Sequence, residues 1–115
     1  MKREIKFRAY SKCTEKMSDW DFIHSVRNLH KLLTLDHVEI MQFTGLVDKN
    51  GREIYEGDIV KHLHSADTCI VMFEKETAMF LAREIGDEKL GFGIEHVTEV
   101  IGNVYQNAEL VGDVV

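Results

Sequence analysis

The chain lacks proline, has only two cysteines, and contains no apolar run near the roughly 20 residues that a membrane-spanning helix needs. Cys13 and Cys69 are far apart and neither belongs to a CxxC pair, so a disulfide framework is not indicated. Charged residues also interrupt residues 4–12, where a secretory signal would need an unbroken apolar segment. We therefore expect a cytoplasmic protein with reduced thiols, in which Cys69 is buried as a small apolar residue.

The sequence patterns of familiar catalytic and nucleotide-binding sites are missing as well. There is no G-x-G-x-x-G or G-x-x-x-x-G-K-[ST] phosphate loop, no G-x-S-x-G nucleophile turn and no H-E-x-x-H metal site. Active sites can also be assembled from scattered residues, so these absences favour a non-enzymatic protein without excluding an enzyme. No cofactor is indicated.

The composition is typical of one soluble globular domain, which we expect to span residues 1–115. Apolar residues make up 44% and charged residues 30% of the chain, enough for a core without metal or disulfide support. The net charge of −6 opposes non-specific nucleic-acid binding, because such binding depends on phosphate neutralisation by Lys and Arg.

Alternation of apolar and polar residues with a period of two predicts a mainly β fold. Asp48-Lys49-Asn50-Gly51 predicts a tight hairpin, since Asn-Gly tolerates positive φ, and Gly57 predicts a bulge or sharp bend. We expect a small bent sheet or a barrel-like domain, such as an SH3-like barrel. Its strands are predicted over residues 5–10, 37–44, 54–63, 68–75, 77–84 and 96–105.

One segment departs from this alternation. Between Asp19 and Leu33, apolar residues recur at intervals of three and four, which predicts one short amphipathic helix near 19–33. Ser18, Asp19 or Asp21 could provide its N-cap. A second, single helical turn is predicted over residues 107–110.

Two groups of residues suggest binding chemistry. Lys6, Arg8 and Tyr10 share one face of the first predicted strand, an arrangement that base-stacking nucleic-acid readers use. His62 and His64 lie two apart on another predicted strand and so project from one face, which suggests a metal-dependent enzyme if His96, Cys69 or Asp67 adds a ligand. A solvated strand face, core aromatics and exposed histidines are the favoured interpretations of these residues.

Three stretches together are similar to one family. They cover residues 3–10 followed by Lys16-Met17, residues 41–60 and residues 100–110, and the central one contains the hairpin and Gly57. Their order resembles the YopX family of bacteriophage and prophage proteins. The resemblance implies a small, mostly β, phage-encoded protein of a bacterial host, without an assigned catalytic residue. Ala108 departs from the family pattern, which often has proline there, and this departure loosens the predicted final turn.

The central stretch is dominated by Gly, Asp and Asn at turns, and such residues specify backbone geometry and need not specify chemistry, so a structural role is favoured over a ligand site. Asp58 is expected to cap the bend at Gly57 through its side chain. If a binding site exists in this stretch, its polar groups are Thr44, Tyr55, Glu56 and Asp58.

The favoured hypothesis is a non-enzymatic phage accessory protein that acts by binding, with an unknown protein partner or with its own copies. Predicted strands with apolar residues on both faces exceed what one small barrel can bury, so a homo-oligomer is expected. A nucleic-acid-binding module is the first alternative and a metal-dependent enzyme is the second.

Overall fold

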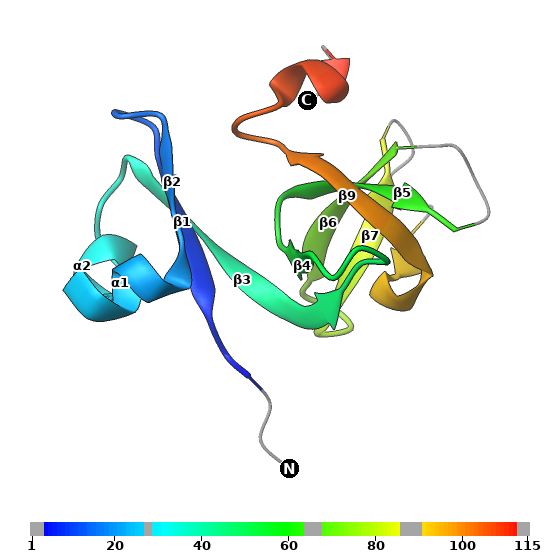
Figure 1. Ribbon diagram of the computed structural model, residues 1–115, viewed down its shortest axis with the longest axis horizontal. Coiled ribbons are helices and arrows are strands. Elements are labelled where there is room, and N and C mark those ends of the chain that lie inside the picture. The colour runs from blue at the N-terminus through cyan, green and yellow to red at the C-terminus, as the bar shows by residue number, and fades with distance from the viewer. Residues whose placement is uncertain (1–3, 27–28, 64–67, 86–90, 113–115) are drawn as a thin grey trace. The chain divides into compact units, whose positions relative to one another are not determined.

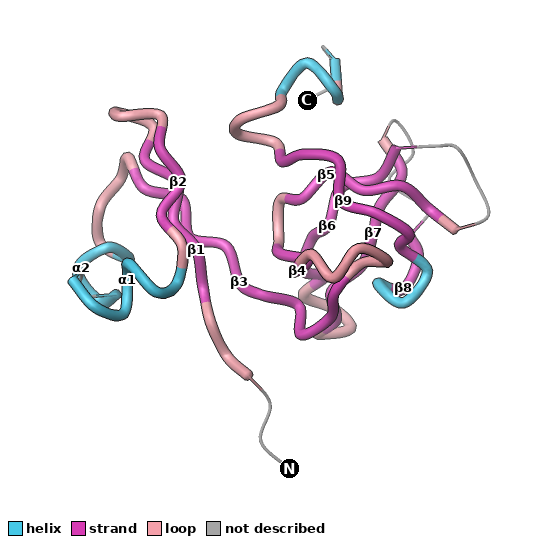
Figure 2. The backbone as a smooth tube through the Cα atoms, in the orientation of Figure 1, coloured by secondary structure: helices cyan, strands magenta, loops and turns pink. Residues whose placement is uncertain are grey.

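The computed structural model describes residues 4–26, 29–63, 68–85 and 91–112, and these residues are mainly β (Figures 1 and 2). The chain divides into two compact units, Met1–Phe43 (unit 1) and Thr44–Val115 (unit 2). The predicted fold class is therefore confirmed. The single domain expected over residues 1–115 stays a prediction.

Unit 1 is a small antiparallel sheet with two helices. Strand β1 (Phe7–Ser11) pairs with β2 (Lys16–Ser18) on one side and with the first part of β3 (Val38–Val47) on the other. Ala9, at the centre of β1, faces Ser18 in one neighbour and Ile40 in the other.

The helical part of unit 1 begins where the sequence predicts. The Phe22 backbone N–H donates to Asp19 Oδ1 at 2.9 Å, so Asp19 is the N-cap among the three candidates. Instead of one helix near 19–33, however, two short helices are present, α1 (Trp20–Val26) and α2 (Leu29–Leu33), and residues 27 and 28 lie outside the described part. A five-residue helix cannot lay a continuous apolar stripe against a sheet, and α2 has no buried residue.

Only part of the predicted apolar stripe is therefore buried. Ile23 is buried, as are the sheet residues Met41 and Phe43, whereas Phe22 and Leu33 remain exposed. The Trp20 ring lies 5.9 Å from the Phe7 ring between centroids, which anchors the start of α1. Unit 1 therefore has a small core and leaves apolar side chains at its surface.

Unit 2 contains a five-stranded antiparallel sheet in the order β8-β7-β6-β5-β9 (strands labelled in Figures 1 and 2). Its strands are β5 (Asp58–His62), β6 (Thr68–Glu74), β7 (Met79–Glu84), β8 (Gly91–Gly93) and β9 (Val97–Asn103), and β4 (Glu53–Tyr55) lies beside β3. Two 3-10 helices, η1 (Ile94–His96) and η2 (Ala108–Leu110), precede and follow β9. The final turn thus forms with Ala108 in place.

The core of unit 2 lies on one face of this sheet. Val60 in β5 is fully buried and pairs with Cys69 on one side and Val100 on the other. The predicted burial of Cys69 is confirmed. Two register shifts interrupt the β5–β9 pairing, and such irregularities bend and twist a sheet, as the bent-sheet prediction requires. The core members are Ile54, Val60, Cys69, Val71, Ala82, Ile94 and Val100.

The turns of the central stretch also match their prediction. The Gly51 N–H donates to the Asp48 carbonyl at 3.0 Å, and Gly51 has φ +80. Gly57 has φ +83 and joins β4 to β5. Strands β2 and β8 are absent from the prediction, because three residues are too few to show an alternation.

Candidate functional site

The side chain of Asp48 ties the hairpin after β3 to the far edge of the sheet in unit 2. Its Oδ1 accepts the backbone N–H groups of Asn50 and Arg52, both at 2.9 Å. Its Oδ2 accepts the N–H of Val100 at 2.9 Å, from the edge strand β9. The carboxylate is therefore buried, and both of its oxygens accept hydrogen bonds. The bond to Val100 also occupies a backbone N–H on an edge strand, where another chain could otherwise pair.

These contacts decide the charge state of Asp48. Burial by itself raises the pKa of the carboxyl. The three backbone N–H donors, followed by the positive charge of Arg52, lower the pKa by more, so it lies below its ordinary value of 3.8. Asp48 is thus ionised at neutral pH and serves as a structural anion.

Two of the four polar residues predicted to converge in the central stretch, Thr44 and Asp58, also hydrogen-bond the backbone through their side chains. Thr44 Oγ1 donates to the Ile54 carbonyl at 2.8 Å. Asp58, with 0% exposure, accepts the Tyr55 N–H at 2.8 Å through Oδ2, which confirms its predicted capping role. Tyr55 is buried and Glu56 is half-buried. None of the four lines the pocket described below, and their role as a binding site stays a prediction.

The basic strand offers little surface for stacking bases. Tyr10 is buried. The Lys6 side chain is only 14% exposed, with its Nζ 2.8 Å from Glu4 Oε1 and 4.8 Å from the centre of the Phe43 ring. Arg8 is half-buried. A nucleic-acid reader needs an exposed aromatic ring beside free cations, so this geometry does not favour the nucleic-acid hypothesis.

Of the histidine pair, the structure describes only His62, since His64 lies outside the described residues. His62 is buried rather than exposed, because its ring packs 4.0 Å from that of Phe92 between centroids. The His96 ring lies 6.0 Å from the His62 ring. Within residues 4–26, 29–63, 68–85 and 91–112, no three His, Cys, Asp or Glu side chains form a cluster that could hold a metal ion.

A surface that the sequence did not single out lies at the end of the β6–β7 hairpin. We name Met72, Phe73 and Met79 the hairpin patch, because all three are exposed apolar residues on paired strands. By alternation and register, Glu74 and Arg83 share one sheet face with Met72 and Met79. Arg83 Nη2 lies 2.9 Å from Glu74 Oε2, and Arg83 Nε lies 3.1 Å from Met72 Sδ.

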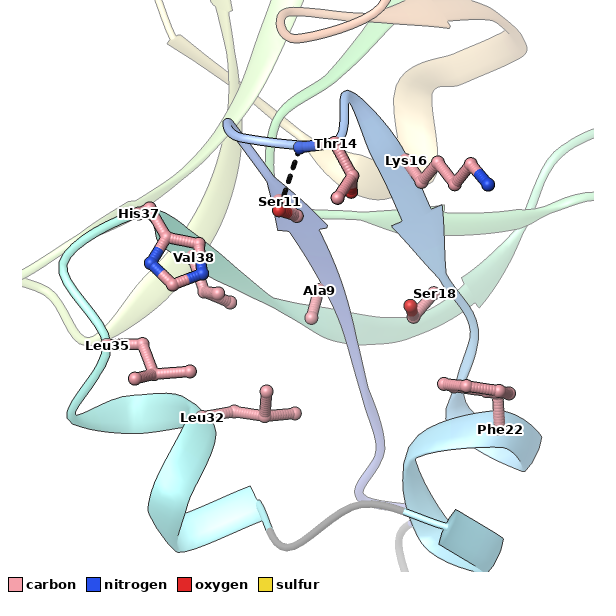
Figure 3. A pocket seen from close by; sticks show the side chains of 10 residues that line it. All are labelled: Ala9, Ser11, Thr14, Lys16, Ser18, Phe22, Leu32, Leu35, His37 and Val38. Carbon is pink, nitrogen blue, oxygen red and sulfur yellow. Dashed lines mark hydrogen bonds between the residues drawn. The ribbon is translucent and has the colours of Figure 1, made fainter.

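Unit 1 contains a pocket of about 370 Å³ between the β1–β2 hairpin and the helical segment (Figure 3). One side of the pocket is formed by Ala9 and by residues of β2 and its preceding turn. The other side is formed by Phe22 of α1, Leu32 of α2 and the residues that lead into β3. Sequence analysis missed this pocket, because its lining comes from five separate segments and only the incomplete apolar stripe hinted at it. Its lining residues are Ala9, Ser11, Thr14, Lys16, Ser18, Phe22, Leu32, Leu35, His37 and Val38.

Comparisons with known proteins bear on the whole chain. The model of the YopX protein family matches residues 6–112. Protein EF1440 from Enterococcus faecalis has a similar solved structure, with a TM-score of 0.65, 21% sequence identity, and coverage of 96% of this chain and 99% of that chain. Protein YopX from Bacillus subtilis has a TM-score of 0.57 and 25% identity, over 91% of this chain and 96% of that chain. No curated protein sequence is significantly similar.

None of the helices within the described residues is both long enough and apolar enough to cross a membrane.

Proposed function

The chain belongs to the YopX family, and on that premise we propose that it is a non-enzymatic phage or prophage accessory protein that acts by binding, first of all to further copies of itself. Its place of action is the cytoplasm of the bacterial host. The observation that carries this proposal is the exposure of the hairpin patch, Met72, Phe73 and Met79.

The chemistry of the patch suits a second copy of the chain. By register Met72 and Met79 lie on one face of the hairpin and Phe73 lies on the other. Exposed apolar side chains such as these lose contact with water when another surface covers them. Glu74 and Arg83, which lie next to the patch, carry opposite charges. In a dimer with two-fold symmetry, each residue that contacts a partner residue is matched by the reverse contact, so Glu74 of one copy can face Arg83 of the other.

The polar residues of the central stretch support the same conclusion. Asp48 and Asp58 are two of the carboxylates that a catalytic or ligand site could use there, yet both are buried and accept backbone N–H groups. They hold turns and a strand edge in place. A surface that associates is therefore a better candidate for function than a reaction centre in this stretch.

The test is the molar mass in solution of the wild-type chain and of the variant Met79→Lys, by size-exclusion chromatography with light scattering at micromolar concentration. Position 79 is the cross-strand partner of Glu74, so a lysine there lies beside an opposite charge within the same chain and causes no like-charge repulsion with it. The matched control is Val47→Lys, because Val47 is also on a strand and is 54% exposed, compared with 52% for Met79.

We expect the wild-type chain and Val47→Lys to be oligomeric and Met79→Lys to shift toward the monomer. A monomeric wild-type chain would refute self-association. An oligomer that survives Met79→Lys but dissociates with Val47→Lys would place the interface elsewhere and refute the role of the patch.

A further inference from the structure

We propose that the pocket of unit 1 binds a small amphipathic anion, a medium-chain carboxylate whose alkyl chain lies against the leucines and whose head lies at the hydroxyl and lysine rim. This inference goes beyond the proposed function. It concerns unit 1, whereas the hairpin patch belongs to unit 2, so either can fail without the other.

The pocket has an apolar wall that the fold leaves unfilled. Leu32, Leu35 and Val38 contribute aliphatic side chains, and Figure 3 shows Leu32 and Leu35 turned toward the space beside Ala9. Phe22 adds an exposed aromatic ring. The volume of about 370 Å³ lies within the range of roughly 300–1,000 Å³ that small-molecule sites occupy. An alkyl chain of moderate length therefore fits both the size and the surface of the pocket.

The opposite side of the pocket carries hydrogen-bond donors. Ser11, Thr14 and Ser18 present hydroxyl groups from β1, β2 and the turn between them. The Ser11 Oγ accepts the Thr14 backbone N–H at 3.3 Å, so its own hydrogen can still be donated to a ligand. On the leucine side, His37 adds a ring nitrogen next to Leu35 and Val38, from the segment before β3. Several donors at one end and an apolar wall at the other are what a carboxylate with an alkyl chain needs.

The charge of the lining selects an anion. The described residues that line the pocket include Lys16 but neither Asp nor Glu, although the whole chain has a net charge of −6. Among the described residues, Lys6 and Lys12 of the same unit have carboxylate partners, Glu4 and Glu39, at 2.8 and 3.0 Å. For Lys16, no acidic partner occurs within the described ranges.

Lys16 occupies the rim rather than the floor of the pocket. Figure 3 shows its side chain extended outward from β2. Its flexible four-carbon stem allows the ammonium group to meet a carboxylate at the mouth while the alkyl chain stays inside. The shape of the pocket would admit cations and neutral molecules as well as anions. Only the charge of Lys16 and the hydrogen-bond donors favour an anion.

The test uses octanoate, octylammonium and acetate as probes of the full chain, with isothermal titration calorimetry for affinity and stoichiometry. Trp20 provides a second readout, because it is the only tryptophan in the chain and begins the helix that carries Phe22. Three variants are compared with the wild type. Lys16→Gln removes the rim charge, Ser18→Leu fills the pocket from a strand position, and Lys49→Gln is the control on an exposed hairpin of unit 2.

We expect one octanoate per chain, with a saturable change in Trp20 fluorescence, and much weaker binding of octylammonium and acetate. Lys16→Gln should weaken octanoate binding about two- to fivefold, as expected for an exposed charge pair. Ser18→Leu should abolish binding and Lys49→Gln should leave it unchanged. Equal binding of octanoate and octylammonium would overturn the anionic preference. No saturable binding of octanoate at millimolar concentration, or equal weakening by Lys49→Gln, would overturn the site.

Discussion

At the scale of single residues, the Asp48 carboxylate holds three backbone N–H groups in place. It accepts N–H groups from its own turn and from Val100, which lies 52 positions later in the chain. In Asp48→Asn, one of the two oxygens becomes an NH₂ group, which cannot accept a hydrogen bond. We expect this variant to lose about 1–3 kcal/mol of unfolding free energy, because a buried N–H is left unpaired.

Chemical denaturation of Asp48→Asn and of the exposed control Asp36→Asn checks this expectation. The control should stay within about 0.5 kcal/mol of the wild type, as most surface substitutions do. Equal stability of the two variants would show that the Asp48 contacts contribute little.

The lowered pKa of Asp48 also predicts how stability depends on pH. The native pKa lies below the ordinary value of 3.8, so as the pH falls the unfolded chain takes up this proton before the native protein does. The stabilisation is therefore present above the ordinary pKa and is lost as the pH falls toward and through the native pKa. Urea unfolding at a series of pH values should show a steeper loss below about pH 5 in the wild type than in Asp48→Asn. Parallel profiles would contradict the assignment.

At the scale of elements, two turns contain a residue with positive φ, and we expect substitutions at these two residues to change stability in different directions. Gly57 has φ +83, and hydrogen bonds fix it from both sides, from its N–H to Val71 and from Val104 to its carbonyl. Gly57→Ala should lose about 1–2 kcal/mol, because L-residues are strained in the left-handed region. Ala78 already bears that strain at φ +56, in the turn between β6 and β7.

Ala78→Gly should relieve the left-handed strain, partly offset by the greater freedom of glycine in the unfolded chain, which costs about 0.4–1 kcal/mol. We therefore expect its stability to equal or slightly exceed that of the wild type. Thermal and urea unfolding of both variants provide the comparison. If both changes destabilise the protein equally, the backbone conformations described here are wrong.

Some of these strands and turns could be predicted from the sequence and others could not. Period-two alternation located the long strands, and Asn50-Gly51 located the hairpin, since both are local signals. The turn at Ala78 could not be predicted, because alanine carries no preference for positive φ and tertiary pairing of β6 with β7 imposes the conformation. The helix prediction was correct in place but wrong in number.

The candidate sites could not be predicted from local sequence patterns alone, because their residues come together only in the folded chain. The Asp48–Val100 contact joins residues far apart in sequence, and the alternation that locates a strand does not say which strand edge a distant turn will cover. His62 was expected at the surface, but its burial depends on Phe92, which lies outside every strand predicted from the sequence. The pocket of unit 1 likewise exists only once the helices are placed beside the β1–β2 hairpin.

At the scale of the whole molecule, the question is how copies of an acidic chain could associate. A net charge of −6 makes copies repel one another at long range, so a stable interface must combine apolar contact with local charge pairing. The hairpin patch has both, since Glu74 and Arg83 flank its methionines. This prediction rests on the proposed self-association and concerns which charges meet across the interface.

Two single variants test it by mixing. Glu74→Arg leaves two positive charges beside the patch and Arg83→Glu leaves two negative charges, so each variant alone should repel its own copies and be monomeric. In a two-fold interface, position 74 of one copy faces position 83 of the other, and a mixed pair therefore restores both attractions. Equimolar mixing should produce a heterodimer by light scattering, with an association that weakens as salt increases. If both variants stay monomeric after mixing, the substitutions act only through the contact within each chain, and Glu74 and Arg83 do not meet across an interface.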